Sequence, residues 1–347
     1  MMAAVFHGPN NIAVQEVPVA NKQAMLKVNA CAVCGYDARV FRNGHRKVSP
    51  PVILGHELCG EILQDVAARD VTIKAGSRVA MCPLIPCLNC HYCRSGDYNL
   101  CTNLKEIGST MDGGFAQYVT IPDQIIKIGG LITVPDSLSD EEAALLEPLA
   151  CCLNSFSQVD GAACKSPVVI MGDGPVGLLH LQLFKKLAGV KVAVVGKVPS
   201  RMQRAVSMGA DAVFEYNDLD ANRTALDVKD FTGESGAGIV VISTSNPAAF
   251  KFATKISGKN SKINVFAGMP EGQPFSLEPN WLHYNQITIT GTFSSTPAML
   301  QAAAGIAAEK AVDLSRIVTH QYSLADIEKA MLATEKYYGL RAVINKF

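Results

Sequence analysis

The stretch that decides the fold reads Ser166-Pro-Val-Val-Ile-Met-Gly172-Asp-Gly174-Pro-Val-Gly177. A short apolar run rich in β-branched residues leads into a G-x-G-x-x-G turn, and a segment with helical apolar periodicity begins at Val176. This order predicts a buried parallel strand, a tight turn, and a helix whose N-terminus points at the turn. We therefore expect a dinucleotide-binding βα unit, with an ordinary glycine-rich turn as the alternative.

Each position of this turn has an expected task in holding a dinucleotide. Gly172 allows the turn, Gly174 lets a pyrophosphate approach the backbone, and Gly177 lets helix and strand pack closely. Pro175 and Val176 lie where the helix begins, and the free N–H groups and positive dipole end of that helix would hold the phosphates.

Strands and helices alternate from about residue 151 onward. Strands are expected at residues 168–171, 191–195, 239–243, 263–267 and 286–291, and helices at 176–188, 201–208 and 248–256. This alternation indicates a doubly wound parallel sheet. Residues 151–291 are therefore predicted to form a Rossmann dinucleotide-binding domain.

The chain upstream of this domain has a different pattern. Short β-type runs broken by Gly and Pro occur at residues 2–6, 24–28, 60–63, 78–81 and 114–121, which predicts a β-rich, barrel-like domain. After residue 291 we expect a helical segment that ends in a β-type run at 341–344. This tail is expected to return to the first domain, so that residues 1–150 and 292–347 form one domain around the Rossmann insertion.

Composition limits the class of protein. The 347 residues are enough for two domains, and an apolar content of 48% with 18% charged residues fits a globular enzyme. Basic and acidic residues are both 31, so no nucleic-acid or membrane partner is expected. With no apolar run of membrane-spanning length and no signal-like N-terminus, we expect a cytoplasmic protein.

Four of the eleven cysteines are tightly clustered, at Cys87, Cys90, Cys93 and Cys101. In a reducing compartment such a cluster more often binds a metal than forms disulfides. Four thiolates enclose a zinc ion tetrahedrally and leave no open position, which is typical of a structural site. Free thiols or an iron–sulfur cluster are the alternatives, but the spacing departs from the ferredoxin runs.

Four further residues of metal-ligand type lie far apart in the sequence: Cys34, His56, Glu57 and Glu147. A catalytic zinc takes about three protein ligands and keeps one position open for water or substrate. Each of these residues alone has a plain structural interpretation, as a cysteine packed in an apolar strand or a glutamate at a helix start.

These fragments occur in one order with the four-cysteine segment, the run Asp112-Gly-Gly-Phe-Ala-Gln-Tyr118 and the glycine turn. Together they resemble the zinc-containing medium-chain dehydrogenase/reductase family, and within it the sorbitol (polyol) dehydrogenase-like branch. The resemblance implies a GroES-like β-barrel that carries a catalytic zinc and a Rossmann domain that binds the nicotinamide cofactor. It also implies an active site in the cleft between the two domains, and a homodimer or homotetramer.

The resemblance also implies roles for single residues. Cys34 and His56 match zinc ligands of the family, while Glu57 and Glu147 match acidic positions that share the remaining ligand role. Zinc would polarise the substrate oxygen, and a hydride would pass to the nicotinamide. The expected reaction is hydride transfer between NAD(P) and a secondary hydroxyl of a polyol, sugar or cyclitol. A threonine or simple-alcohol dehydrogenase and a non-catalytic cofactor-binding relative are the alternatives.

The chain departs from the family pattern at two sites, and the first is the proton-relay position. Tyr36 stands where the family has the Ser or Thr that relays the alcohol proton, and Arg39 stands where polyol dehydrogenases tend to have His. The family's Asp is matched by Asp37, for which a helix cap is the structural alternative.

The second departure lies at the cofactor site. An NAD enzyme is expected to place an acid on the ribose 2′-OH about 20 residues past the glycine turn, where this chain has Gly196. Lys197 and Arg201 follow, so the missing acid and the added bases favour NADP over NAD. The alternative is that both cations belong to a solvated helix face.

Overall fold

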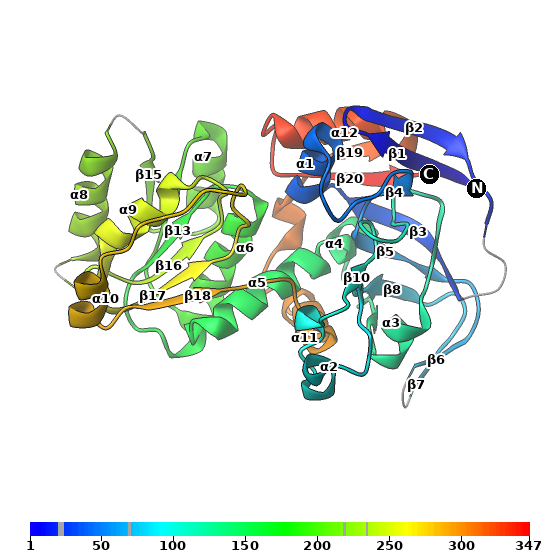
Figure 1. Cartoon of the computed structure of the whole chain (residues 1–347), viewed down its shortest axis with the longest axis horizontal. Helices are drawn as coiled ribbons and strands as arrows, with labels where there is room; N and C mark the ends of the chain where they lie inside the picture. The colour runs from blue at the N-terminus through cyan, green and yellow to red at the C-terminus, as the bar shows by residue number, and fades with distance from the viewer. Residues whose placement is uncertain (20–23, 69–70, 218–219, 234) are drawn as a thin grey trace. The chain divides into compact units, whose positions relative to one another are not determined.

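The computed structural model describes residues 1–19, 24–68, 71–217, 220–233 and 235–347. The chain divides into two compact units (Figure 1). Unit 1 contains Met1–Ala150 and Ser294–Phe347, and unit 2 contains Cys151–Phe293. No helix within the described residues is long and apolar enough to cross a membrane.

Unit 1 is built on a strongly connected β-sheet. Its strands are β3 (Met25–Ala32), β5 (Glu57–Ile62), β8 (Arg78–Met81), β11 (Tyr118–Thr120), β12 (Leu131–Thr133), β19 (Val318–Ser323) and β20 (Arg341–Lys346). The order across the sheet is β12-β8-β5-β3-β20-β19, and β11 also pairs with β3. The C-terminal strand β20 therefore lies beside β3, from the first part of the chain.

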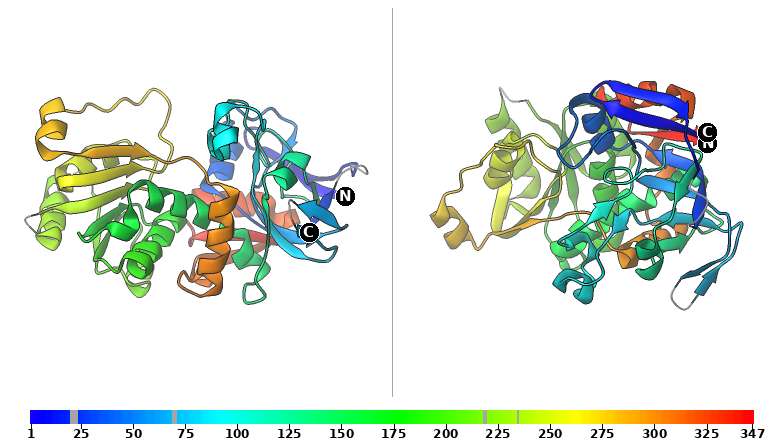
Figure 2. Two further views of the ribbon diagram at one scale, coloured as in Figure 1. Left: turned by 90° about the horizontal axis from the view of Figure 1, so that it is seen from below. Right: turned by 45° about the vertical axis from the view of Figure 1, so that its right-hand side comes forward.

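Smaller sheets and short helices complete unit 1. The strands are β1 (Met2–Gly8), β2 (Asn11–Glu16), β4 (Val52–Ile53), β6 (Val66–Ala68), β7 (Val71–Ile73), β9 (Leu84–Ile85) and β10 (Lys105–Glu106). The helices are α1 (Gly35–Asn43), α2 (His91–Ser95), α3 (Asp123–Lys127), α4 (Asp140–Ala144), α11 (Pro297–Ala308) and α12 (Ile327–Glu335). Figure 2 shows the two chain termini close together, because β1 and β20 both belong to this unit.

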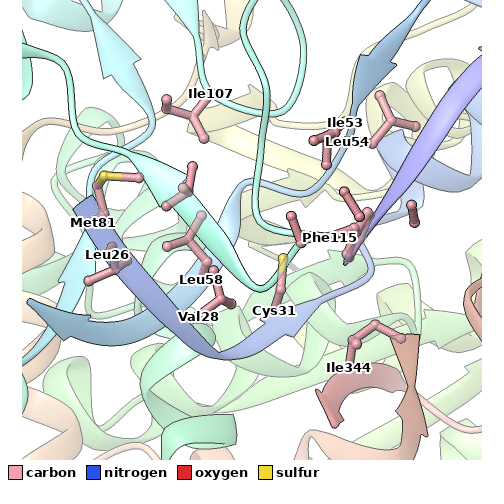
Figure 3. Packing of buried hydrophobic residues seen from close by; sticks show 14 of the residues in the cluster. Leu26, Val28, Cys31, Ile53, Leu54, Leu58, Met81, Ile107, Phe115 and Ile344 are labelled. Atoms are coloured by element: carbon pink, nitrogen blue, oxygen red, sulfur yellow. The ribbon is translucent and has the colours of Figure 1, made fainter. Parts of the chain in front are cut away.

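The core of unit 1 lies against β3 and β5. Figure 3 shows Val28, Cys31, Leu58 and Phe115 packed together, and all four side chains are at most 3% exposed. Leu26 and Val28 of β3 face this core, Cys31 does so after a register shift between Val28 and Ala30, and the strand is buried on both faces from Ala30 onward. The burial holds the ends of β3 and β5 in a fixed position.

The register of β3 places three distant segments together. In the antiparallel pair β3–β5, Ala32 lies opposite Glu57, and in the antiparallel pair β20–β3, Val343 lies opposite Ala32. The end of β3, the start of β5 and the start of β20 thus meet at one place. This is where the chain leaves β3 for α1.

Unit 2 contains a six-stranded parallel sheet. Its strands are β13 (Val168–Met171), β14 (Val192–Gly196), β15 (Ala212–Glu215), β16 (Ala237–Ile242), β17 (Ser257–Val265) and β18 (Thr288–Gly291), in the order β15-β14-β13-β16-β17-β18. All five pairings are parallel, and the order reverses at β13, as in doubly wound dinucleotide-binding folds. The predicted fold class is confirmed.

Helices cover the sheet of unit 2 because its central strands are apolar on both faces. They are α5 (Leu146–Gln158, which begins in unit 1), α6 (Pro175–Leu183), α7 (Pro199–Ser207), α8 (Ala221–Thr232), α9 (Ala248–Ile256) and α10 (Pro279–Asn285). Val169 and Met171 of β13 pack with Phe250 and Phe252 of α9 in one core. Val168 and Ile170, on the other face of the strand, are fully buried as well.

Some expected elements differ from the structure. The helix expected at 176–188 is α6 followed by a π-helical segment, Phe184–Ala188. Of the strand expected at 114–121, only β11 is formed. Upstream of β11, the backbone N–H groups of residues 113–115 donate to the carbonyl groups of residues 53–55 outside any named strand. The expectation that the tail is helical up to 341 was wrong, since β19 pairs in parallel with β20; the alternating polar residues of β19 hid it.

The turn between β13 and α6 depends on close backbone approach. Gly172 has φ 121°, a conformation that favours glycine, and α6 begins with Gly174 as N-cap and Pro175 in the first turn. A Cβ added to Gly177 would lie 2.0 Å from the carbonyl oxygen of Gly172. Helix and strand can pack this closely only because residue 177 has no side chain.

Gly177→Ala is therefore expected to destabilise unit 2 by about 1–3 kcal/mol, because the clash is with backbone and only a shift of helix from strand relieves it. Urea unfolding measures the loss. Gly268→Ala is the control, since a Cβ there meets nothing within 4 Å. Equal stability of the two variants would contradict the close-packing role.

Candidate metal centres and dinucleotide turn

Cys34, His56 and Glu57 form a cluster in unit 1. Their ligand atoms all lie within 4.8 Å of one another. Cys34 follows the end of β3, and His56 and Glu57 stand at the start of β5, so the β3–β5 register brings them together. A thiol, an imidazole and a carboxylate at this spacing are a donor set that suits zinc.

Asp37 fixes the first turn of α1 and faces His56. Its Oδ2 accepts a hydrogen bond from the backbone N–H of Cys34 at 2.9 Å, and its Oδ1 lies 3.4 Å from Nδ1 of His56. The carboxylate is fully buried. It is thus both a helix cap and the partner of the imidazole, and it leaves Nε2 of His56 for a metal, as carboxylate partners of metal-binding histidines do.

Glu57 is paired with Arg341 of β20. Their Oε1 and Nη2 atoms are 3.1 Å apart, and the side chains are only 1% and 3% exposed. Nη1 of Arg341 donates to the carbonyl of Val33, while Oε2 of Glu57 is buried with no hydrogen-bond partner in the described part of the chain. Burial raises the pKa of Glu57 well above its usual value, although the charge of Arg341 opposes this. A cation beside Oε2 would satisfy this oxygen.

The surroundings also prepare the Cys34 thiol for metal binding. Burial alone would raise its pKa, but the hydrogen bond with His56 and the charge of Arg341 outweigh burial and lower the pKa to about 7. Since the thiolate is the metal ligand, this shift favours the binding form. The residues present therefore fit a bound zinc ion.

Glu147 lies in the first turn of α5 and is 8% exposed. It is not part of the three-residue cluster, but its charge is near enough to raise the pKa of Glu57. The structure thus brings three of the four expected catalytic-zinc residues together and leaves Glu147 at their edge.

Tyr36 lies beside the cluster in a hydrogen-bonded group. Its hydroxyl is 3.1 Å from Oγ of Ser109 and 3.3 Å from Nδ1 of His45, and its ring meets His56 edge-on at 5.9 Å. Burial raises the pKa of Tyr36 above its usual value, although the Ser109 hydrogen bond opposes this. Arg39, one turn along α1, is exposed. The hydroxyl group expected at the relay position is therefore present as a phenol held by two partners.

The four-cysteine segment forms a second cluster in unit 1. The sulfur atoms of Cys87, Cys90, Cys93 and Cys101 all lie within 4.8 Å of one another, and none of these four residues forms a disulfide. Sγ–Sγ distances of 3.5 Å and 3.9 Å are close to the about 3.8 Å edge of a tetrahedron of thiolates around zinc. Hydrogen bonds from the backbone N–H groups of Thr102 and Cys93 lower the pKa of Cys90 to about 5. The donors suit a closed structural zinc site.

The expected cofactor residues lie at the carboxyl ends of β13 and β14 in unit 2. Gly172, Gly174 and Pro175 form the turn and the start of α6, and Val176 follows in the first turn of the helix. Gly196 ends β14.

The two cations expected near the cofactor differ in burial. Lys197 is exposed, with Nζ 5.1 Å from the centre of the Tyr216 ring. Arg201 is only 5% exposed, and its Nη1 lies 3.9 Å from where a Cβ on Gly174 would be. Arg201 is therefore directed at the glycine turn rather than at a solvated helix face.

The chain is similar to known zinc-type dehydrogenases over both of its units. Residues 20–130 match the alcohol dehydrogenase GroES-like domain, and residues 175–309 match the zinc-binding dehydrogenase domain. The chain is 32% identical to a sorbitol dehydrogenase of Bacillus subtilis, over 95% of this chain and 92% of that protein. The chain belongs to the zinc-containing medium-chain dehydrogenase/reductase family, in its polyol dehydrogenase-like branch.

Two further relatives extend the comparison of this dehydrogenase. D-arabitol-phosphate dehydrogenase of Enterococcus avium is 29% identical over 90% of this chain and 87% of its own length. A zinc-binding dehydrogenase of Sinorhizobium meliloti, solved with NADP, superposes with a TM-score of 0.87 at 27% identity, covering 99% and 98% of the two chains. These relatives support zinc, a nicotinamide cofactor and a small-molecule substrate for this dehydrogenase.

Sequence reasoning missed three residues that lie around the Cys34–His56–Glu57 cluster: Arg341, His45 and Ser109. Arg341 is the first residue of the otherwise apolar strand β20. A cation at such a position suggests a buried ion pair, but only the β20–β3 register identifies Glu57 as its partner. His45 lies within hydrogen-bonding distance of the Tyr36 hydroxyl, a contact that no motif in the sequence indicates. Ser109 lies in a loop far from Tyr36 in the sequence and gave no signal.

The Glu57–Arg341 pair gives a stability prediction. Arg341→Met should destabilise unit 1 by about 3–5 kcal/mol, because it leaves a buried carboxylate without its cation. Adding Glu57→Gln should recover about 1–3 kcal/mol of that loss. Denaturant unfolding of the two single variants and the double variant measures both effects; strictly additive losses would show that the two side chains do not interact.

Proposed function

We propose that this chain is a zinc-dependent oxidoreductase that transfers a hydride between NAD(P) and a secondary hydroxyl of a polyol, sugar or cyclitol. The observation that carries the proposal is the Cys34–His56–Glu57 cluster, in which Glu57 is buried and the other two are partly exposed. It offers metal ligands of three kinds beside a hydroxyl-bearing side chain. The similarity to sorbitol dehydrogenase supports a polyol as substrate. The four-cysteine cluster, by contrast, has only thiolates and suits structure rather than catalysis.

In this proposal Cys34 and His56 hold the catalytic zinc, and Glu57 or Glu147 supplies the remaining ligand. Glu57 offers Oε2, since its Oε1 faces Arg341. When bound, zinc acts as a Lewis acid that lowers the pKa of an alcohol oxygen. Cys87, Cys90, Cys93 and Cys101 hold the second zinc.

The remaining residues act by orientation and hydrogen bonding. Asp37 keeps the His56 ring in place through Nδ1, and Arg341 balances the negative charge of Glu57 in a buried setting. The Tyr36 hydroxyl, held by Ser109 and His45, is positioned to exchange a hydrogen bond with a substrate hydroxyl.

The cofactor-binding part of the proposal rests on unit 2. We assign unit 2 as the dinucleotide-binding domain and unit 1 as the catalytic domain. NADP is the preferred cofactor in this proposal, because Gly196 brings no acid to the ribose 2′ position and Lys197 and Arg201 add positive charge near it. The NADP complex of the S. meliloti relative supports the choice.

Assembly and location complete the proposal. A homodimer or homotetramer is proposed, with the edge strand β18 as a candidate contact, since Thr288 at its start is exposed. A cytoplasmic location is proposed because a reducing compartment keeps the clustered cysteines reduced and available for metal.

Replacing one ligand in each metal cluster separates their roles. His56→Ala should reduce turnover at least a thousandfold, as expected when a catalytic metal is lost, while the protein stays folded and still binds cofactor. Cys93→Ser should instead lower the thermal stability, because structural zinc contributes folding free energy.

Three measurements check this contrast: zinc content, melting temperature and reduction of the cofactor by a secondary alcohol. We expect two zinc ions per chain in the native protein and one in each variant. Full activity with His56→Ala would refute the catalytic assignment.

Tyr36→Ser tests the relay position. A smaller hydroxyl should keep a donor and acceptor but open space beside His56, and we expect kcat/KM ratios among substrates to change about tenfold or more. The measurement is a panel of polyols, cyclitols and sugar acids, each with NAD and NADP. Tyr36→Phe is the matched control for the hydroxyl alone, and unchanged ratios in both variants would exclude a role for Tyr36 in specificity.

A further inference from the structure

A carboxylate that the sequence analysis did not single out lies in the glycine turn (Gly172–Gly177) of unit 2. Asp173, between Gly172 and Gly174, is 8% exposed and reaches across to the neighbouring strand. Its Oδ2 accepts hydrogen bonds from the backbone N–H groups of Lys197 at 2.9 Å and Val198 at 2.7 Å. The side chain thus links the turn after β13 to the turn after β14.

The Asp173 carboxylate occupies the space beside Gly196 that the side chain of an acid at position 196 would need. In dinucleotide-binding folds the acid that bonds the ribose 2′-OH stands at the end of the second strand, which is Gly196 here. A Cβ on Gly196 would lie 2.5 Å from Oδ2 and 2.6 Å from Cβ of Asp173. Residue 196 can therefore carry no side chain while residue 173 is aspartate, and the two positions are sterically coupled.

We infer that Asp173 is a specificity-determining residue that replaces the acid missing at Gly196 and restrains binding of the cofactor 2′-phosphate. The group has the same chemistry as the usual acid and lies at the same end of the same strand, but it comes from the phosphate turn. Two effects follow from its position. Its negative charge repels the 2′-phosphate. Its Oδ2 also accepts hydrogen bonds from two backbone N–H groups that could otherwise donate to that phosphate.

The inference rests on the proposed dinucleotide site and refines the proposed preference for NADP. Lys197 and Arg201 attract a 2′-phosphate, whereas Asp173 opposes it, so the balance of these charges sets the ratio of the two affinities. The preference for NADP in the native protein is accordingly modest. Removing the charge of Asp173 should make it strong.

The test is the dissociation constants of NAD and NADP, measured by titration calorimetry on the whole protein without substrate. Asp173→Asn keeps the size of the side chain but removes its charge. We expect the ratio of NADP to NAD affinity to rise about tenfold, as for the loss of one repulsive charge a few ångströms from a phosphate. An unchanged ratio overturns the inference.

A relocated carboxylate separates specificity from simple structural support. Asp173→Gly should raise the ratio like Asp173→Asn, and adding Gly196→Asp should lower it again towards the native value. The partner change must be to glycine, because even the Cβ of residue 173 would clash with a side chain at 196. If Asp173 only capped the turn, the new aspartate would not restore the ratio, and the inference would fail.

Asp211→Asn is the matched control. This carboxylate also accepts a backbone N–H bond, from Val192 at the opposite end of β14, and pairs with Lys185. It should affect stability but leave the cofactor ratio unchanged, and a shift equal to that of Asp173→Asn would overturn the inference. Failure of the native protein to bind either dinucleotide would refute the proposed function itself, an outcome distinct from an unmoved ratio.

Discussion

The antiparallel pairing of β3 with β5 on one side and β20 on the other is the constraint on which the Cys34–His56–Glu57 cluster depends. Ala32 lies opposite both Glu57 and Val343, so the residues just beyond these pairs meet at one point. Since side chains alternate along a strand, a slip of one residue would turn Glu57 away from Cys34. The packed core around Cys31, Leu58 and Phe115 holds the register in place (Figure 3).

Charge balance is the second requirement of this cluster. Asp37, Glu57 and the Cys34 thiolate bring negative charge into a buried place, and Arg341 is the buried cation that faces them. A buried carboxylate without a partner would be protonated or would destabilise the fold. The last strand of the chain therefore contributes to the electrostatics of the candidate metal centre, although none of its residues is a proposed ligand.

Two glycines in the turns of unit 2 allow other atoms to approach the backbone closely. Gly177 and Gly196 both lack a side chain because other atoms occupy the space, a carbonyl oxygen in one case and the Asp173 carboxylate in the other. One glycine brings helix and strand together, as the G-x-G-x-x-G pattern predicts. The absence of a side chain at Gly196 is explained by Asp173, which lies on a different turn. Position 196 therefore lacks an acid, but a carboxylate from Asp173 occupies the same place.

The sequence by itself determined the fold class, the family and the two sets of candidate metal-ligand residues, because spacing and local pattern carry that information. Strands β8 and β13 were predicted to the residue. For β13 the reason is plain, since its apolar run lies between Pro167 and Gly172. Only the tertiary structure decided that Arg341 pairs with Glu57, that His45 and Ser109 hold Tyr36, and that Asp173 fills the space at Gly196. Those contacts join residues from 9 to 284 positions apart. Their partners are set by strand register and loop packing, which no local pattern encodes.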